Sequence, residues 1–378
     1  MKIGLVCPYA INKGGGVLEI VRAQQRVLRQ RGHDVYIITP RPQDHEDAPE
    51  DHVIFVGGST DFRSPTRTTF QVSASVGEAI EEMLAAEQFD ILHFHEPWIP
   101  VLSSQILSRS QAINVATFHA KLPETMMSRT MAKVITPYTK PILKYIDAFT
   151  AVSDAAAEYV CSLTEAPVAI IPNGIDLTLF TRPVAFPNEE RRPKTILYVG
   201  RLEGRKGVKY LIRAFKLLSD SDPDVALVLA GDGPDRPKLE LLVEDLELKN
   251  VTFLGYISNE DKVRYLQQSD LFCVPSLYGE SFGVVLLEAM ATGLVTVAGD
   301  NPGYAGVMTD LGALSLVDPK QTVEFARRLK LLLRENDLRA LWRKWAAKEI
   351  QQYTWEHIVS QYEEIYEKAL AAGKTSRE

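Results

Sequence analysis

The chain contains little cysteine and no long apolar run. Its 378 residues include three cysteines, Cys7, Cys161 and Cys273, which are scattered and odd in number. They therefore indicate neither a disulfide framework nor a zinc site. No run of about 18 apolar residues that could span a bilayer is present, and the opening MKIGLVCPYA lacks the apolar core of a signal peptide. We expect a cytoplasmic protein, which could still work at the inner face of a membrane.

The chain also lacks an excess of positive charge, with 42 Lys and Arg against 49 Asp and Glu. The net charge of −7 argues against a dedicated nucleic-acid-binding protein, which would show a basic footprint, although it leaves room for a local basic patch. With 46% hydrophobic and 24% charged residues, the composition is that of a globular protein. The length predicts two domains of ordinary size, each with its own core.

Short β-rich runs alternate with amphipathic stretches along the whole chain. Such a pattern is typical of parallel sheets covered on both faces by helices. The strands that we predict are 2–6, 34–39, 52–56, 90–94, 114–118, 148–152 and 168–172, then 195–200, 225–231, 251–255, 271–275 and 295–299. We expect two doubly wound α/β halves joined by a linker at 176–194, which is rich in proline and charge. Ligands of such sheets lie beyond the carboxyl ends of the strands, so the cleft between the halves is the expected site.

The segment GESFGVVLLEAMATG, residues 279–293, places two glutamates around a predicted helix start. Ser281 is the expected N-cap, and the outward amides of Phe282, Gly283 and Val284 would suit an anion. Eight helical residues would separate Glu280 and Glu288 by about 12 Å. That separation exceeds the roughly 5–9.5 Å of an acid/base pair at one glycosidic bond. It suits two carboxylates that grip opposite ends of a long ligand, although an ordinary capped helix with a solvated glutamate is the alternative.

Further candidate residues follow other predicted strands. GRLEGRKG (200–207) follows the first strand of the second half and supplies Arg201 and Lys206. The forked guanidinium of an arginine and the compact charge of a lysine ammonium together suit a diphosphate. The alternative is a pair of solvated loop cations. PYAINKGGGV (8–17) precedes the first helix with three glycines, but it is neither G-x-G-x-x-G nor a Walker loop, so it is a weak phosphate motif. His119 in TFHA ends a strand, and alone it is more often structural.

Together these motifs resemble a known family. Glu280-Ser-Phe-Gly…Glu288, GRLEGRKG, IPNGID (171–176), AVSD (151–154), the glycine loop and TFHA are similar to the retaining nucleotide-sugar glycosyltransferases of family 4. Within the family, MKIGLVCPY…GGGV, HFHEP and VATFHA are most similar to bacterial phosphatidylinositol mannosyltransferases. The resemblance implies the GT-B fold, two Rossmann-like doubly wound parallel-sheet domains facing a central cleft. Residues 1–176, completed by a last helix at about 354–378, would form the acceptor domain, and 177–353 the nucleotide-sugar donor domain.

The resemblance also implies roles for individual residues. The catalytic group would be Arg201, Lys206, His119 and Glu280, with the two cations on the donor diphosphate, His119 facing the donor sugar and Glu280 accepting from its hydroxyls. The donor would further contact Gly15, Gly16, Tyr256, Ile257, Lys262, Phe282, Gly283, Val284 and Glu288, with Glu288 on the ribose and Tyr256, Ile257 and Lys262 near the base. The acceptor would meet Tyr9, Arg63 and Arg67.

The implied reaction moves a hexose from a nucleotide sugar, GDP-mannose or a UDP-sugar, to an acceptor hydroxyl. The acceptor would attack from the face of the leaving phosphate, which takes its proton, so that the anomeric configuration is retained. The resemblance implies neither a cofactor nor a metal ion. Two patterns imitate metal sites: Asp220-Ser-Asp222, which we interpret as turn residues, and His93, His95 and Glu96, which we interpret as part of the cleft wall.

The sequence does not identify the acceptor. The resembling mannosyltransferases have a basic helix that meets anionic lipid, whereas the corresponding region here, 75–88, is acidic. Lysines and arginines mixed with Met and Ile in 120–146 could instead contact an anionic membrane, or this stretch could be an ordinary packed helix. We expect a lipid headgroup such as phosphatidylinositol or a soluble sugar or sugar phosphate as acceptor. A nucleotide-sugar epimerase is a further alternative.

Overall fold

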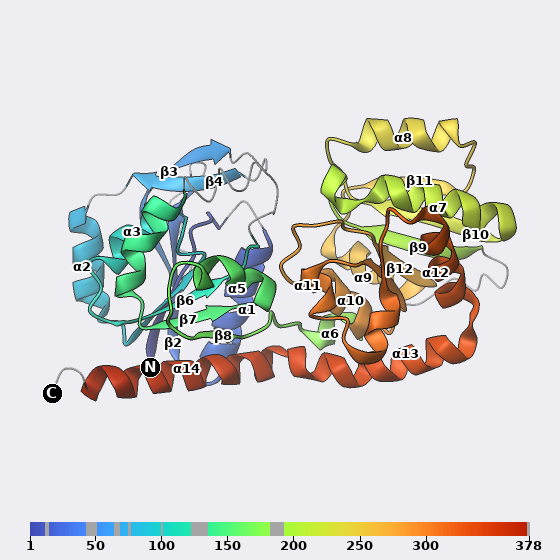
Figure 1. The fold of residues 1–378 in the computed structure, drawn as a ribbon. Coiled ribbons are helices and arrows are strands. Elements are labelled where there is room, and N and C mark those ends of the chain that lie inside the picture. Colours follow the sequence, from blue (N-terminus) through green and yellow to red (C-terminus); the bar gives the residue numbers. More distant parts are fainter. Residues whose placement is uncertain are drawn as a thin grey trace. The chain divides into compact units, whose positions relative to one another are not determined.

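A computed structural model of the chain describes residues 1–11, 15–42, 51–63, 69–74, 77–99, 101–121, 135–181 and 193–375. Of residues 58–63, 69–74, 374 and 375 it describes the backbone alone. The chain divides into two compact units (Figure 1). The first unit comprises Met1–Gly174 together with Trp355–Glu378, and the second comprises Ile175–Thr354.

The first unit is built on an eight-stranded sheet in the order β4-β3-β2-β1-β5-β6-β7-β8. Its strands are β1 (Lys2–Val6), β2 (Asp34–Arg41), β3 (Val53–Arg63), β4 (Thr69–Ala74), β5 (Ile91–His95), β6 (Ile113–Phe118), β7 (Ala148–Ala151) and β8 (Val168–Ile170). Its helices include α1 (Gly16–Gln30), α2 (Gly77–Glu87), α3 (Leu102–Leu107), α5 (Asp154–Cys161) and α14 (Trp355–Thr375). Every residue of β5 and β6 is buried, as expected of parallel strands covered on both faces.

The second unit has a six-stranded parallel sheet in the order β11-β10-β9-β12-β13-β14. Its strands are β9 (Lys194–Val199), β10 (Val225–Ala230), β11 (Val251–Gly255), β12 (Leu271–Val274), β13 (Thr296–Gly299) and β14 (Leu316–Val317). Its helices are α6 (Leu177–Phe180), α7 (Val208–Ser221), α8 (Arg236–Asp245), α9 (Asn259–Gln268), α10 (Val284–Ala291), α11 (Pro302–Ala305), α12 (Thr322–Arg334) and α13 (Asn336–Glu349). The prediction of two α/β units with parallel sheets is confirmed.

Strand order positions the functional loops. In the first sheet β1 lies between β2 and β5, and in the second β9 lies between β10 and β12. The chain therefore builds each sheet outward from this first strand, first to one side and then to the other. The loop beyond the carboxyl end of such a strand opens at the switch point, where ligands of doubly wound sheets bind. The glycine segment 8–17 follows β1, and the segment GRLEGRKG follows β9.

The last helix packs on the first unit, against segments that are distant from it in sequence (Figure 1). Trp355, Ile358 and Val359 of α14 are buried in the same core cluster as residues of β1 and α1. The Trp355 ring also covers Gly174, where an added Cβ would lie 2.4 Å from it. Among the described residues, no helix combines the length and the apolar character that crossing a bilayer requires.

The structure differs from the sequence expectation at one edge of each sheet. In the second sheet the edge strand β14 was not predicted. The predicted strand 52–56 continues to Arg63 as β3, which turns into an antiparallel pairing with β4, a strand that we did not predict. An antiparallel strand joins a parallel sheet most easily at such an edge. The beginning of the expected linker forms the short helix α6, capped by the Asp176 side chain, whereas residues 182–192 lie outside the described part.

Candidate active site

The loop between β9 and α7 carries three cations, Arg201, Arg205 and Lys206. The Tyr198 hydroxyl donates to the Arg201 carbonyl at 2.8 Å, which fixes the loop where it leaves the strand. Gly207 ends the loop with φ 71°, and an added Cβ there would lie 2.1 Å from the Pro275 carbonyl oxygen. The cations therefore stand on backbone that is packed directly against the loop after β12.

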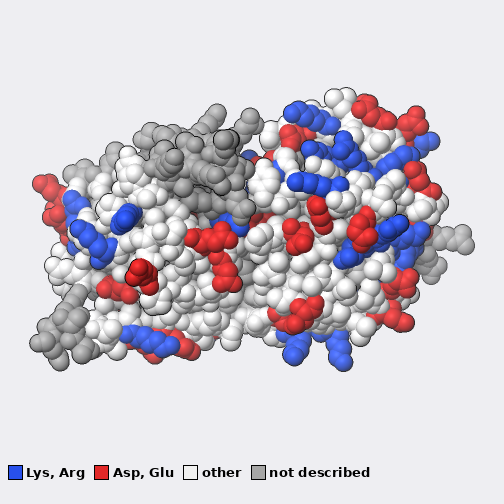
Figure 2. All heavy atoms as spheres, in the orientation of Figure 1, with Lys and Arg blue, Asp and Glu red and all other residues white. Residues whose placement is uncertain are grey.

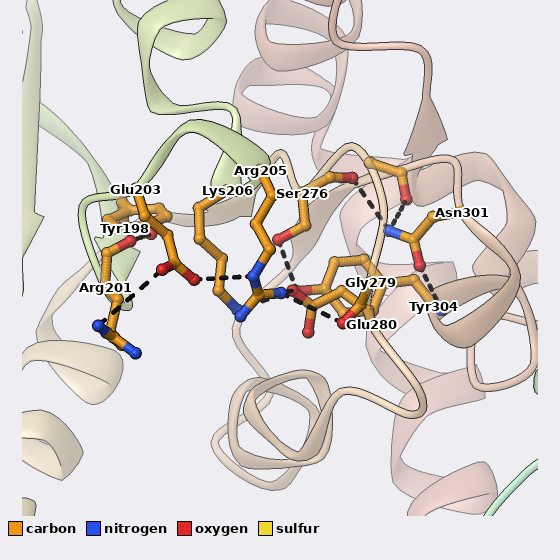
Figure 3. Close-up of polar contacts among 11 residues, drawn as sticks. Tyr198, Arg201, Glu203, Arg205, Lys206, Ser276, Gly279, Glu280, Asn301 and Tyr304 are labelled. Atoms are coloured by element: carbon orange, nitrogen blue, oxygen red, sulfur yellow. Dashed lines mark hydrogen bonds and ion pairs between the residues drawn. The ribbon is translucent and has the colours of Figure 1, made fainter. Parts of the chain in front are cut away.

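Both inner cations of this loop contact the predicted site residue Glu280 (Figure 3). Lys206 Nζ lies 2.7 Å and Arg205 Nη1 2.8 Å from the same oxygen, Glu280 Oε1. Arg205 Nε forms a second ion pair with Glu203 Oε1 at 2.7 Å. Burial by itself would lower the pKa of Arg205, but the two carboxylates outweigh it and raise the pKa. Arg201 is half-exposed and reaches Glu203 at 4.0 Å, so it is the cation least engaged by carboxylates here.

Neighbouring backbone and polar groups brace the Glu280 loop from the other side. Asn301 Nδ2 donates to the Ser276 carbonyl at 3.0 Å, and the Ser276 and Tyr304 hydroxyls lie 3.1 Å apart (Figure 3). Gly303 approaches so closely that an added Cβ would lie 2.2 Å from the Glu280 carbonyl oxygen. The position of the Glu280 backbone thus depends on the start of α11.

The helix after Glu280 begins later than predicted, and the assignment of Ser281 as N-cap is wrong. The N-cap of α10 is Gly283, with φ 102°, and no side chain caps the helix. An added Cβ at Gly283 would lie 2.7 Å from the Tyr304 ring, so only glycine fits at this turn. Phe282 precedes the cap, and its buried ring packs edge-on against Tyr353 with centroids 5.8 Å apart. The amides that open the helix therefore begin with Val284 and exclude Phe282.

The structure brings together the predicted donor residues Lys262 and Glu288. Lys262 Nζ of α9 lies 2.6 Å from Glu288 Oε1 of α10, and both side chains are largely buried. Burial raises the pKa of Glu288, and the charge of Lys262 acts in the opposite direction. Tyr256, just after β11, is 89% exposed and Ile257 is half-buried.

His119 lies in the first unit at the end of β6, in a cluster of buried polar groups. Its Nε2 is 2.9 Å from His95 Nδ1, and its backbone amide donates to Glu96 Oε1 at 2.7 Å. Burial lowers the pKa of His119 to about 3, and a hydrogen bond with Asn173 acts against this shift. The imidazole is therefore neutral near pH 7, so it can serve as a hydrogen-bonding group and not as a cation. Burial also raises the pKa of Glu96 to about 7.

The two patterns that imitate metal sites have other partners. His93 contacts Tyr366 of α14 at 2.7 Å and Thr117 at 2.6 Å, inside the core. Asp222 accepts two 2.7 Å hydrogen bonds from Arg334. Within the described part of the chain, no three His, Cys, Asp or Glu side chains form a group that could hold a metal ion.

The remaining predicted residues lie around β1 and at the sheet edge. Tyr9 is half-buried after β1, and burial together with nearby Glu96 raises its pKa well above the usual value. Gly15 is the N-cap of α1 with φ 136°, Gly16 is its first residue, and a Cβ at either would meet no described atom within 4 Å. Arg63 ends β3 with only its backbone described, and Arg67 lies outside the described residues.

Comparison with known proteins decides the family. A family profile described as Glycosyltransferase Family 4 matches residues 14–179, and one described as Glycosyl transferases group 1 matches residues 183–349. A phosphatidyl-myo-inositol mannosyltransferase of Mycolicibacterium smegmatis is 32% identical over 99% of this chain and 95% of its own length. One from Mycobacterium leprae is 31% identical over 99% of this chain and 98% of its own. The chain belongs to glycosyltransferase family 4.

This family 4 glycosyltransferase also has solved structural neighbours. Sucrose-phosphate synthase from Thermosynechococcus elongatus superimposes with a TM-score of 0.78 at 23% identity, covering 98% of this chain and 99% of its own. The Anabaena protein HepE in complex with UDP and glucose gives 0.75 at 19% identity, covering 97% and 100%. These likenesses show the GT-B fold that we expected from the motifs.

Sequence reasoning missed several residues of the candidate site. Arg205 lies inside GRLEGRKG, and its place beside Lys206 was a signal that we did not use. Glu203 lies inside the same motif and pairs with its neighbours Arg201 and Arg205, a local signal that we also did not use. Tyr304 gave no signal, because its contacts with Ser276 and Gly283 join segments distant in sequence. Figure 2 shows Lys and Arg side chains on the second unit around α7 and α8, with Asp and Glu side chains among them.

The close approach of Gly303 to Glu280 can be tested with a neighbouring control. Gly303→Ala should lower transfer activity and reduce the free energy of unfolding by about 1–3 kcal/mol, because the new Cβ must displace backbone. Gly306→Ala should leave both nearly unchanged, since its nearest such contacts are at 3.7 Å. Thermal unfolding and an activity assay measure the difference. Equal behaviour of the two variants would contradict the role given to this contact.

The Lys262–Glu288 pair predicts a pH-dependent stability difference. Lys262→Met leaves the buried carboxylate unopposed, so it should destabilise the protein by about 2 kcal/mol at pH 8. Because burial raises the pKa of Glu288, the carboxyl takes up a proton as the pH falls, and the destabilisation should shrink towards pH 5. Urea unfolding of both proteins across this range measures it. A difference independent of pH would rule out the ion pair as its cause.

Proposed function

We propose that this glycosyltransferase moves a hexose from a nucleoside-diphosphate sugar to an acceptor hydroxyl, with retention of configuration. The observation that carries the proposal is the set of three cations after β9, at the switch point of the second sheet. Two of them, Arg205 and Lys206, contact Glu280. A diphosphate is the ligand such a cluster suits, because a guanidinium fork and an ammonium point charge neutralise adjacent phosphates.

In this proposal Arg201 and Lys206 stabilise the negative charge that develops on the leaving diphosphate. Arg201 has its side chain 49% exposed and can reach a ligand, while Lys206 would exchange Glu280 for phosphate. Preorganised cations of this kind act mainly in the transition state, where the sugar–phosphate bond is breaking. The start of α10 at Val284 adds its helix dipole to the same task. Because these groups neutralise the diphosphate, we propose that the reaction needs no metal ion.

Glu288 and Glu280 would bind the two ends of the donor. Lys262 engages Glu288 through Oε1, which leaves Oε2 to accept from the ribose hydroxyls. Glu280 would accept from the sugar, with Tyr256 and Ile257 beside the base. His119 would face the sugar as a neutral imidazole, consistent with the lowering of its pKa.

The proposal of retention rests on the resemblance to retaining glycosyltransferases, and the state of the carboxylates near the cations argues only against a covalent glycosyl-enzyme intermediate. Glu203 and Glu280 both form ion pairs, and a carboxylate engaged in this way is a poor nucleophile. We therefore propose attack of the acceptor on the face that the phosphate leaves, with the phosphate oxygen taking the acceptor's proton.

For donor and acceptor we propose GDP-mannose and the headgroup of phosphatidylinositol. The support is the name of the relatives, phosphatidyl-myo-inositol mannosyltransferase, at 31–32% identity over nearly the full length. The acceptor would bind the first unit near Tyr9, Arg63 and Arg67. If the enzyme glycosylates a soluble sugar or sugar phosphate efficiently, that class of acceptor replaces this part of the proposal.

A peripheral contact with anionic membrane would serve such an acceptor. Tyr138 is 64% exposed, and the exposed Lys140 and Lys144 follow it on the segment 135–146. Aromatic and basic side chains together suit the interface of an anionic bilayer. Lys133, in the same predicted stretch 120–146, lies outside the described residues, and Lys121 is buried and paired with Glu158.

The donor clamp predicts the effect of removing either cation. Arg201→Ala and Lys206→Ala should each lower turnover by about two powers of ten or more, because each removes charge that stabilises the leaving group. Initial rates with GDP-mannose and with UDP-glucose measure this, with circular dichroism to verify folding. Activity should persist in EDTA. Near-normal turnover in both variants would contradict the assignment of Arg201 and Lys206 to the donor diphosphate.

The membrane contact predicts binding to anionic vesicles. The protein should sediment with phosphatidylserine vesicles at low salt, bind phosphatidylcholine vesicles weakly, and detach as salt screens the charges. Lys140→Glu with Lys144→Glu should weaken binding severalfold. The control pair, Lys344→Glu with Lys348→Glu on α13, has the same spacing and exposure and should bind normally. Equal loss in both pairs, or no binding by the unaltered protein, would count against this surface.

A further inference from the structure

The proposed function leaves one conflict at Lys206. Its ammonium is assigned to the donor diphosphate, yet it lies 2.7 Å from Glu280 Oε1. The Glu280 side chain is only 12% exposed, so it cannot lose its counter-charge cheaply. A buried carboxylate left without a partner is strongly unfavourable. Lys206 can therefore leave for a phosphate only if another group keeps Glu280 neutralised.

Arg205 is placed to be that group. Its Nη1 donates to Glu280 Oε1 at 2.8 Å and to the Gly279 carbonyl at 3.2 Å. Its Nε forms the ion pair with Glu203, and its own carbonyl accepts from the Leu277 amide at 2.8 Å. The guanidinium is thus anchored along its whole length (Figure 3). Such a fork, once held by several partners, loses little further freedom in each contact.

The contacts of the two cations are not equivalent. Among the described carboxylates of this cluster, Lys206 forms an ion pair with Glu280, whereas Arg205 bridges Glu203 and Glu280. A lysine ammonium is a single charge on a flexible stem, so it can move to a new anion while the bridging arginine stays. Both cations use Oε1, so the change of partner would leave Oε2 to accept from the sugar.

We propose that Arg205 is a positioning residue of this enzyme: it holds Glu280 in place so that Lys206 is released to the donor diphosphate. The proposal rests on the proposed function, because it assumes that the site takes a nucleoside diphosphate. Arg205 itself would not touch the phosphates. This distinguishes it from Arg201 and Lys206, and it makes the effect of Arg205 depend on the charge of Glu280.

A double-mutant cycle on the full-length protein tests this dependence. The probes are GDP and UDP, with dissociation constants measured by titration calorimetry. Arg205→Gln should weaken binding of the better probe by about tenfold, because Lys206 must then stay with Glu280. In the Glu280→Gln background, where no carboxylate retains Lys206, the same change should alter affinity by less than about twofold. Arg205→Lys keeps a charge beside Glu280 and should restore most of the lost affinity.

Arg334→Gln is the matched control. Arg334 forms an ion pair with Asp222 at the other end of α7, and its side chain has nearly the same exposure as that of Arg205, 33% against 32%. It should leave the dissociation constants unchanged, which separates local positioning from a general loss of stability.

The failures of the cycle can be told apart. If Arg205→Gln weakens binding equally in both backgrounds, Arg205 is a phosphate ligand or a general structural residue, and this inference is overturned. Unchanged affinity in Arg205→Gln alone would overturn it as well. If neither GDP nor UDP binds the unaltered protein, the proposed function itself fails, and the inference with it.

Discussion

The second unit is organised around the neutralisation of one largely buried carboxylate, that of Glu280. Two cations from the loop after β9 meet a single oxygen of this group, which arrives on the loop after β12. The strands that bear these loops are adjacent in the sheet, so the ion pairs join segments about 75 residues apart at one edge. In the structure the carboxylate holds the cations as a phosphate would.

Close backbone approach keeps the two loops in register. Gly207 lies against the Pro275 carbonyl, and Gly303 lies against that of Glu280. Neither position has room for a side chain, so the cations and the carboxylate are held by packed backbone and not only by their charges. In the first unit burial lowers the pKa of His119 to about 3, so this side chain carries no desolvated charge near pH 7.

The sequence predicted the sheets well because apolar β-rich runs in parallel strands are a strong local signal. It also predicted the partners Lys206 and Glu280 as members of one site, since motifs at the carboxyl ends of neighbouring strands meet at one sheet edge. It failed at Ser281, where the local capping preference yields to the tertiary contact between Gly283 and the Tyr304 ring. It also failed at β4, because strand pairing at an edge depends on a neighbour that local periodicity does not reveal.

The roles of individual side chains were harder to predict for the same reason. That Arg205 bridges two carboxylates, or that Lys262 reaches Glu288, depends on which loops and helices pack together. The motif GRLEGRKG contains both Arg205 and Lys206, and nothing within it distinguishes the anchored cation from the one free to change partner. Only the contacts of the folded chain separate them.

The central claim is that the donor diphosphate takes Lys206 from Glu280. The most direct measurement is a crystal structure of the protein with GDP-mannose or UDP-glucose, whichever binds. The account expects diphosphate oxygens within hydrogen-bonding distance of Lys206 Nζ and the Arg201 guanidinium, with Arg205 still bridging Glu203 and Glu280. A bound donor whose diphosphate contacts neither Arg201 nor Lys206, while Lys206 remains on Glu280, would contradict it.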